Sequence, residues 1–352
     1  MPQTMRFAAP RRVEVIETPS HDLVPGQVRV RTIASGISAG TELTAYRGTN
    51  PYLTSTWDPE VRVFRDAQDT PPQGYPLDGW GYSEVGTVVE VATDPARDPA
   101  PDDVEVGDVV WGIWGHRSEA VLSQDTLRGH SLPDHLDPLA GCFVRVGAIA
   151  LNAVLAADTG VGETVVVLGQ GVIGLLATRI AVLSGATVIA VDGIEARLEQ
   201  ARQMGAHHTL RPDDGLALAV RELTGTSGVD VAVELSGSYH GLQAATRVVG
   251  ADGLVIASGF YQGGADVLRL GDEFHHNRVT IQASQIGGPP PRKAARWDQP
   301  RMNRTVVDLM ASGRLDPLAL VTHRFPLEDA ARAYEMLDTD GASALQTVLE
   351  MS

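Results

Sequence analysis

Three glycines and an aspartate near the middle of the chain have the types and spacing needed to hold a dinucleotide. A largely β-branched run, 164–168, ends at Gly169, and Gly171 and Gly174 follow in the pattern GxGxxG. The first glycine of such a turn permits a sharp bend, the second lets the backbone approach a pyrophosphate, and the third allows close helix–strand packing. A helix-compatible segment and a second apolar run then lead to Asp192, about 20 residues on, where the fingerprint places its acidic residue. The spacing predicts a strand–turn–helix–strand unit with phosphates at the helix N-terminus.

The acidic residue favours NAD over NADP. Asp192 can accept hydrogen bonds from an adenosine ribose, and its charge would repel a 2′-phosphate. Arg197 could soften that discrimination. We expect further cofactor contacts from Val172, Ile173 and Gly193. A plain βαβ turn without a ligand is the less favoured alternative.

Strands and helices alternate after this unit, which predicts a parallel, doubly wound sheet of the α/β class. Two apolar strands end at the pairs Ser236-Gly237 and Ser258-Gly259. Ligands bind beyond the carboxyl ends of such strands. Both pairs are therefore candidate cofactor contacts.

Length and composition limit the class of protein. The 352 residues suit two domains, and 43% hydrophobic with 20% charged residues is typical of a soluble globular protein. A net charge of −16 argues against nucleic acid as a partner. The single cysteine, Cys142, excludes intramolecular disulfides and a four-cysteine zinc lobe. We expect no membrane-spanning run and a cytoplasmic location.

The N-terminal part has a different pattern. Short strands broken by turns, such as the alternating run 28–33, predict a β-rich domain through about residue 147. Residues 48–76 have no clean period, and their aromatics favour an ordered substrate-side loop.

Four further stretches carry a resemblance to a known superfamily. They are GISAGTE at 36–42, GYSEVG at 81–86, VGDVV at 106–110 and FPLEDAARAYEML at 325–337. With the glycine-rich turn, they make the chain resemble the medium-chain dehydrogenase/reductase superfamily, the alcohol and polyol dehydrogenases. The resemblance implies a GroES-like catalytic domain of residues 1–147 and 290–352 and a Rossmann domain of residues 148–289. It also implies a substrate cleft between them and a homodimer or homotetramer.

The departures from this resemblance concern zinc. Zinc members of the superfamily carry a cysteine at the position of Ser38, a His-Glu pair at Tyr82 and Ser83, and a further ligand near Arg145. A catalytic zinc needs at least three Cys, His or carboxylate ligands. The comparison therefore implies a zinc-independent branch with no metal site.

Without a metal, a side chain must polarise the carbonyl or take the alcohol proton. The resemblance places Thr41 at the superfamily's proton-relay hydroxyl, and a turn-capping hydroxyl is an equal alternative. Glu42 could be a base if it is desolvated, although a solvated or ion-paired carboxylate is commoner.

Three more residues are candidates for the same role. Tyr82 could donate a hydrogen bond to a substrate oxygen, or simply pack. Arg145 could bind an anionic substrate or the cofactor phosphates, or could pair with a nearby carboxylate. His116 is the generic acid–base candidate because its ordinary pKa is near neutrality, with a structural role as the alternative.

We therefore predict a zinc-independent, NAD(H)-dependent oxidoreductase. It would interconvert a secondary alcohol and a ketone on a small hydroxylated metabolite such as a sugar or cyclitol. Three alternatives remain: a redox-neutral epimerase or lyase with tightly bound NAD, an NADPH-dependent quinone or enoyl reductase, and a non-catalytic NAD-binding protein.

Overall fold

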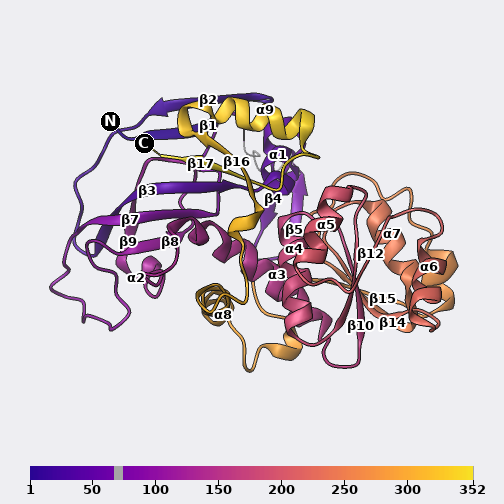
Figure 1. The fold of residues 1–352 in the computed structure, drawn as a ribbon. Coiled ribbons are helices and arrows are strands. Elements are labelled where there is room, and N and C mark those ends of the chain that lie inside the picture. The colour runs from indigo at the N-terminus through magenta and orange to yellow at the C-terminus, as the bar shows by residue number, and fades with distance from the viewer. Residues whose placement is uncertain (67–73, 352) are drawn as a thin grey trace. The chain divides into compact units, whose positions relative to one another are not determined.

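The chain divides into two units, each with its own hydrophobic core (Figure 1). The structure is a computed structural model and describes residues 1–66 and 74–351. The first unit comprises Met1–Arg145 and Pro317–Ser352, and the second comprises Val146–Asp316.

The first unit is rich in β-structure. Its strands are β1 (Gln3–Ala9), β2 (Arg12–Glu17), β3 (Gln27–Ile37), β4 (Ser55–Asp58), β5 (Val63–Asp66), β6 (Leu77–Asp78), β7 (Glu84–Val91), β8 (Val109–Gly112), β9 (Glu119–Ser123), β16 (Val321–Pro326) and β17 (Gln346–Glu350). A six-stranded sheet has the order β16-β17-β3-β7-β8, with β9 also paired to β3. A three-stranded sheet, β2-β1-β6, and the hairpin β4-β5 complete the unit. The hairpin lies in the irregular 48–76 segment, of which residues 67–73 lie outside the described residues.

Alternating burial explains the central strand. Val28 and Val30 of β3 are buried in a small core, while Arg29 forms ion pairs with Glu90 and Glu119. The C-terminal strand β17 pairs with β3 in antiparallel fashion, so the end of the chain completes the sheet that the N-terminal part begins. The predicted β-rich domain with a C-terminal return is confirmed.

Helices close the first unit around an aromatic core. They are α1 (Ala39–Arg47), α2 (Gln124–Leu127) and α9 (Ala330–Asp340), with the 3₁₀ turns η1 (Pro51–Leu53), η2 (Pro138–Phe143), η5 (Leu318–Leu320) and η6 (Leu327–Asp329). The Tyr334 ring of α9 packs edge-on against the Phe7 ring of β1, with 5.1 Å between the ring centroids. It also stacks on the Tyr46 ring of α1, with 5.7 Å between the centroids. These contacts hold α9 against α1.

The second unit is a parallel sheet with helical crossovers, as predicted. Its strands are β10 (Thr164–Leu168), β11 (Thr187–Val191), β12 (His208–Leu210), β13 (Val229–Glu234), β14 (Val249–Ala257) and β15 (Thr280–Ala283). Its helices are α3 (Val144–Ala157), α4 (Val172–Leu183), α5 (Glu195–Gln203), α6 (Leu216–Thr224), α7 (Tyr239–Val248) and α8 (Gln299–Ala311), with the short turns η3 (Leu270–Phe274) and η4 (Pro291–Lys293). The strand order is β12-β11-β10-β13-β14-β15, which reverses between β10 and β13.

The register of this sheet brings four strand ends to one edge. Leu168 at the end of β10 pairs with Val191 of β11 on one side and with Glu234 of β13 on the other. Glu234 in turn pairs with Ala257 of β14. Ligands bind at such an edge, beside the point where the strand order reverses. The residues after these four strands therefore lie at the edge where parallel sheets of this kind bind ligands.

The boundary of the C-terminal return differs from the prediction. Residues 290–316 were assigned to the return, but they belong to the second unit. Helix α8 packs on α3 so closely that a Cβ on Gly147 would lie 2.6 Å from Val306. The irregular sequence around residue 290 marks a change of pattern without revealing which helix α8 packs against.

One helical run tests the expectation of no membrane-spanning segment. Residues Pro138–Ala157, which form η2 and α3, are long and apolar enough to cross a membrane by length and composition. The sequence analysis did not anticipate this. Of its apolar window, 83% is buried inside the protein, as in a core helix.

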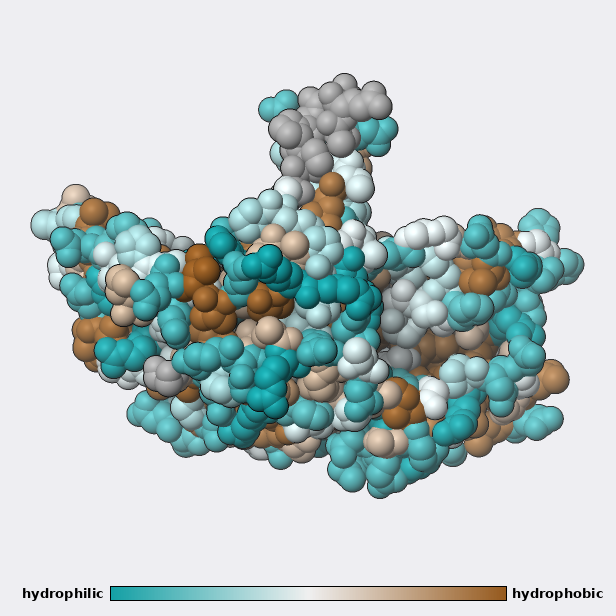
Figure 2. Space-filling view, turned by 90° about the horizontal axis from the view of Figure 1, so that it is seen from above, coloured by the Kyte–Doolittle hydropathy of each residue, from teal (hydrophilic) through white to brown (hydrophobic). Residues whose placement is uncertain are grey.

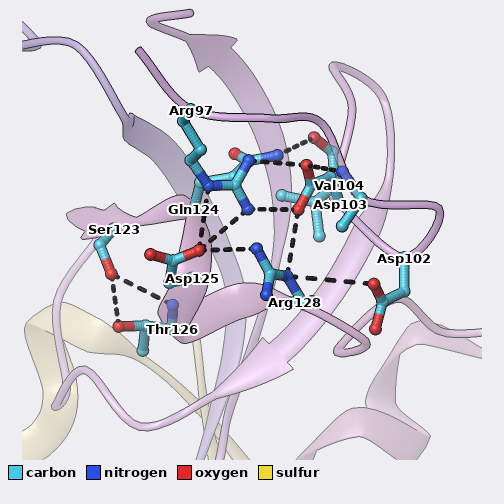
Figure 3. A network of polar contacts seen from close by, with 10 residues as sticks. Arg97, Asp102, Asp103, Val104, Ser123, Gln124, Asp125, Thr126 and Arg128 are labelled. Carbon is cyan, nitrogen blue, oxygen red and sulfur yellow. Dashed lines mark hydrogen bonds and ion pairs between the residues drawn. The ribbon is translucent and has the colours of Figure 1, made fainter. Parts of the chain in front are cut away.

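Figure 2 shows a mostly hydrophilic face with apolar residues in small groups. Charges also organise the turn before β8: Arg97 donates to both Asp103 oxygens at 2.6 and 2.7 Å, and Arg128 bonds Asp125 at 2.8 Å (Figure 3). This ion-pair network ties the turn to α2.

Candidate functional site

The glycine-rich turn has the shape that its spacing predicts. Gly169 has φ +87°, and a Cβ there would lie 2.5 Å from the Ser236 backbone nitrogen. A Cβ on Gly174 would collide with the Gly169 carbonyl oxygen, whereas nothing lies within 4 Å of a Cβ on Gly171. Gly171 caps α4 without a side-chain hydrogen bond. The helix therefore keeps N–H groups for an anion, beside an open backbone.

Asp192 lies at the same edge, directly after β11. Its Oδ2 accepts a hydrogen bond from the Gln170 backbone N–H at 2.7 Å, and its Oδ1 accepts one from Ile194 N–H at 2.9 Å. Only 9% of the residue is exposed. A carboxylate offers about four acceptor positions, so two remain for ribose hydroxyls. The carboxylate both fixes the turn and keeps acceptor capacity.

The other predicted cofactor residues of this half surround the same edge. Val172 and Ile173 open α4 and are half-buried, and Gly193 is exposed with nothing within 4 Å of a Cβ. Arg197 lies in the first turn of α5.

On the other side of the reversal point, the Glu234 carboxylate joins two loops. Its Oε1 accepts from the Ser236 N–H at 2.8 Å and from the Ser236 hydroxyl, and its Oε2 accepts from the Tyr261 hydroxyl. Its backbone oxygen accepts from Ser258 and Gly259 N–H at 3.0 and 3.1 Å. Burial raises the Glu234 pKa, and these hydrogen bonds partly offset the rise. A buried group with this many donors holds the loops after β13 and β14 in one arrangement.

Two features of these loops suit a ligand. The Ser258 hydroxyl is buried and has no hydrogen-bond partner among the described residues. Gly237 has φ +68°, and a side chain on Gly259 would collide with it. A buried hydroxyl without a partner costs free energy unless a ligand or water satisfies it. The open glycine turn, the Asp192 carboxylate and this hydroxyl are groups of the kinds that a dinucleotide cofactor needs.

In the first unit, Tyr82 lies within a group of hydroxyls. Its hydroxyl hydrogen-bonds the Ser38 Oγ, and Thr41, in the first turn of α1, also hydrogen-bonds it. Burial raises the Tyr82 pKa, while the Ser38 and Thr41 hydrogen bonds and the Arg145 charge lower it in part. The phenol therefore stays protonated at neutral pH. The structure brings Ser38, Thr41, Tyr82 and Arg145 together.

Glu42 and His116 also come together, but inside the core. His116 Nε2 lies 2.7 Å from Glu42 Oε2, and its Nδ1 lies 2.5 Å from Ser35 Oγ. Tyr334 donates to the same Glu42 oxygen, and Glu42 Oε1 accepts the Ser38 N–H at 2.7 Å. Glu42 and His116 both have zero exposure. In this arrangement neither side chain can touch a ligand.

Neighbouring carboxylates determine the protonation state of His116. Burial alone would lower the His116 pKa, but the Glu42 and Glu84 carboxylates raise it above its usual value. Ser35 donates to Glu84 Oε1 at 3.0 Å, and the Trp114 N–H donates to Glu84 Oε2 at 2.8 Å. An imidazolium donating from both nitrogens satisfies all of these contacts.

Comparison with known proteins agrees with the fold. A family model described as "Zinc-binding dehydrogenase" matches residues 172–304. D-guloside 3-dehydrogenase of Escherichia coli (strain K12) is 29% identical over 314 residues, which is 88% of each chain. L-galactonate-5-dehydrogenase of the same organism is 30% identical over 57% of this chain and 56% of that one. The crystal structure of 2R,3R-butanediol dehydrogenase from Bacillus subtilis covers 99% of both chains with a TM-score of 0.77 at 22% identity, which shows a shared fold.

These matches support the medium-chain dehydrogenase/reductase superfamily for this chain. Its broad activity is that of an oxidoreductase of this superfamily.

The donor set of this superfamily member does not fit a catalytic zinc. Ser38 and Tyr82 are hydrogen-bonded to each other at the positions of two ligands, and Arg145 carries a positive charge at the third. Among residues 1–66 and 74–351, no group of three or more His, Cys, Asp or Glu side chains is arranged to hold a metal ion. Neutral hydroxyls and a guanidinium are poor zinc ligands.

Several residues of both clusters are not among the candidates that the sequence indicates. Glu234 could have been noticed, because a carboxylate ending an apolar strand just before Ser-Gly is unusual. Tyr261 and Ser35 lie in stretches without a distinctive local pattern. Tyr334 joins Glu42 from 292 positions away. Only tertiary packing reveals such a contact.

Proposed function

We propose that this chain is a zinc-independent, NAD(H)-dependent oxidoreductase that interconverts a secondary alcohol and a ketone on a sugar or related polyol. The observation that carries the proposal is the edge of the parallel sheet. There an open glycine turn follows β10, the Asp192 carboxylate follows β11, and the Ser258 hydroxyl, which has no partner among the described residues, follows β14. The negative charge of Asp192 favours NAD over NADP.

The substrate class follows from the relatives. The relative that spans 88% of this chain is named for oxidation of a guloside at carbon 3, and another for oxidation of galactonate at carbon 5. Both names describe a secondary hydroxyl of a sugar derivative. Several hydroxyls near Tyr82 suit a substrate that itself carries many hydroxyls.

Tyr82 is the proposed proton donor. The bound nicotinamide would supply or accept the hydride. In the reducing direction, the Tyr82 hydroxyl hydrogen-bonds the ketone oxygen and transfers its proton to it as the alcohol forms. The phenolate left behind accepts hydrogen bonds from Ser38 and Thr41, whose hydroxyls can return a proton. The oxidising direction is the reverse of these steps.

The test begins with the purified protein. An absorbance scan for retained cofactor comes first, followed by calorimetric titration with NAD, NADH and NADP. We expect an empty protein that binds NAD more tightly than NADP and forms NADH from one of a panel of sugars and polyols. Absence of NAD binding would refute the proposal. Cofactor that survives purification, with turnover that needs no added NAD, would indicate redox-neutral chemistry instead.

A further inference from the structure

Arg145 is a half-buried cation without an anion. Its side chain forms no hydrogen bond or ion pair with any residue in the part of the chain that the structure describes. Burial lowers its pKa, and the Tyr82 hydroxyl raises it in part. The alternative raised by the sequence, an ion pair with a neighbouring carboxylate, is therefore not formed in this structure.

The neighbouring carboxylate, that of Glu42, already has hydrogen-bond partners on both oxygens. Glu42, which follows Thr41, uses Oε1 for the Ser38 N–H and Oε2 for His116 and Tyr334. It has no exposed surface. It cannot turn toward Arg145 without breaking the buried cluster.

Two other partly buried arginines of this chain have carboxylate partners. The Arg29 side chain, 12% exposed, binds Glu90 and Glu119. The Arg97 side chain, 20% exposed, binds Asp103 and Asp125 (Figure 3). A charge withdrawn from water is costly unless it is paired. The described residues contain no such partner for Arg145, and an anionic ligand can supply one.

We propose that Arg145 binds an anionic group of the substrate, so that the preferred substrate is an acidic sugar carrying a carboxylate or a phosphate. A guanidinium offers two parallel N–H groups that match either oxyanion. Tyr82 beside it would contact the reacting oxygen, so Arg145 would set which hydroxyl of the sugar meets Tyr82. This inference rests on the proposed oxidoreductase function.

A comparison of neutral and anionic sugars of the same configuration tests the proposed role of Arg145. The rate of NADH formation is measured with a neutral hexoside, the hexuronide of the same configuration and its 6-phosphate. We expect the wild-type kcat/KM to favour one anionic member over the neutral one, and the preferred member identifies carboxylate or phosphate. In Arg145→Gln this preference should fall about 30- to 100-fold, as expected for the loss of a charge-assisted pair.

The ratio of anionic to neutral kcat/KM is the informative readout. It cancels any effect of Arg145 on the Tyr82 proton, because that step is common to all three substrates. Arg145→Lys should recover part of the preference, because it restores the positive charge without the two parallel N–H groups of the guanidinium. Arg31→Gln is the matched control, because it removes the same charge from an exposed position of β3 and should leave the ratio unchanged.

Other outcomes would overturn the inference. Wild-type enzyme that oxidises neutral and anionic sugars equally has no anion subsite. An unchanged ratio in Arg145→Gln, with weaker NAD binding, would assign the arginine to the cofactor phosphates. If no sugar is oxidised at all, the proposed function fails. Calorimetric titration of the NADH-bound protein with hexuronate then tests the anion site alone, and binding lost in Arg145→Gln would still support it.

Discussion

The Asp192 side chain has both a structural role and a proposed ligand-binding role. Asp192 accepts hydrogen bonds from two backbone N–H groups and is also the residue proposed to contact the adenosine ribose. Removing its side chain would disturb the turn and the ligand contact together. An amide removes the charge and one of the two acceptor oxygens, and it keeps the size of the side chain and one of the two backbone hydrogen bonds. The turn should therefore be disturbed less by Asp192→Asn than by Asp192→Ala, which helps to separate turn geometry from discrimination between cofactors.

Asp192→Asn should narrow the preference for NAD over NADP. We expect NAD binding to weaken about tenfold while NADP binding stays the same or improves, because repulsion of the 2′-phosphate is lost. Asp192→Ala should weaken binding of both. Calorimetry with the two cofactors measures this, and an unchanged preference in Asp192→Asn would remove the discriminating role.

Tyr82→Phe isolates the proposed proton donor. The substitution removes one hydroxyl and keeps the ring, so kcat should fall about 100-fold or more while the Kd for NAD stays within about twofold. Ser38→Ala should have a smaller effect, since it removes only a hydrogen-bond partner of the phenol. Near-normal turnover in Tyr82→Phe would exclude Tyr82 as the proton donor.

Elements are held in place by the two buried polar clusters. In the first unit, Glu42 of α1, His116 and Tyr334 of α9 join segments far apart in the sequence. In the second unit, Glu234 of β13 joins the loop at Ser236 to the loop at Tyr261. Each cluster contains a buried carboxylate with several hydrogen-bond partners. Removing one partner leaves that carboxylate buried with fewer hydrogen bonds, which lowers the stability of the folded state.

His116→Gln should reduce stability rather than chemistry. Loss of the imidazolium leaves Glu42 buried without its cation, which costs about 3 kcal/mol. The pKa of His116 is raised in the folded state, so its contribution is fully present below the unfolded value of 6.5 and is lost as pH rises through the folded pKa. The stability difference between wild type and variant should therefore shrink above pH 6.5. Denaturant unfolding across pH measures it, and a difference that grows with pH would contradict the assigned imidazolium.

Glu234→Gln should weaken the nicotinamide half of the cofactor site. An amide nitrogen would face N–H and hydroxyl donors, so the two loops would lose their common anchor. We expect NAD affinity to fall about tenfold with little change for AMP, which occupies only the Asp192 side. Tyr261→Phe, which removes one donor, should have a milder effect. Equal losses for NAD and AMP would indicate general unfolding of the unit.

Charge and metal content are properties of the whole molecule. The purified protein should contain no stoichiometric zinc by elemental analysis, and chelators should leave its activity intact, because Ser38, Tyr82 and Arg145 are poor ligands. Stoichiometric zinc whose removal abolishes activity would refute zinc independence. The expected homodimer or homotetramer also remains a prediction, for light scattering to test.

Local sequence was sufficient to predict the fold of the segment from Gly169 to Asp192. The turn at Gly169, the helix that follows it and Asp192 are all specified by residues within one short stretch, since backbone freedom and strand periodicity are local properties. The β-rich domain and the parallel sheet were predictable for the same reason. Position 290 was misassigned because a break in periodicity carries no information about packing partners.

The substrate half depended on contacts between distant segments. Five candidates were named from their residue types, yet only the fold separates Tyr82, Thr41 and Arg145 from the buried pair Glu42 and His116. Burial and pairing are set by α9, which brings Tyr334 to Glu42 from the far end of the chain. Sequence patterns state which chemistry a side chain can perform. Whether it meets water, a ligand or a buried partner depends on packing that no local pattern encodes.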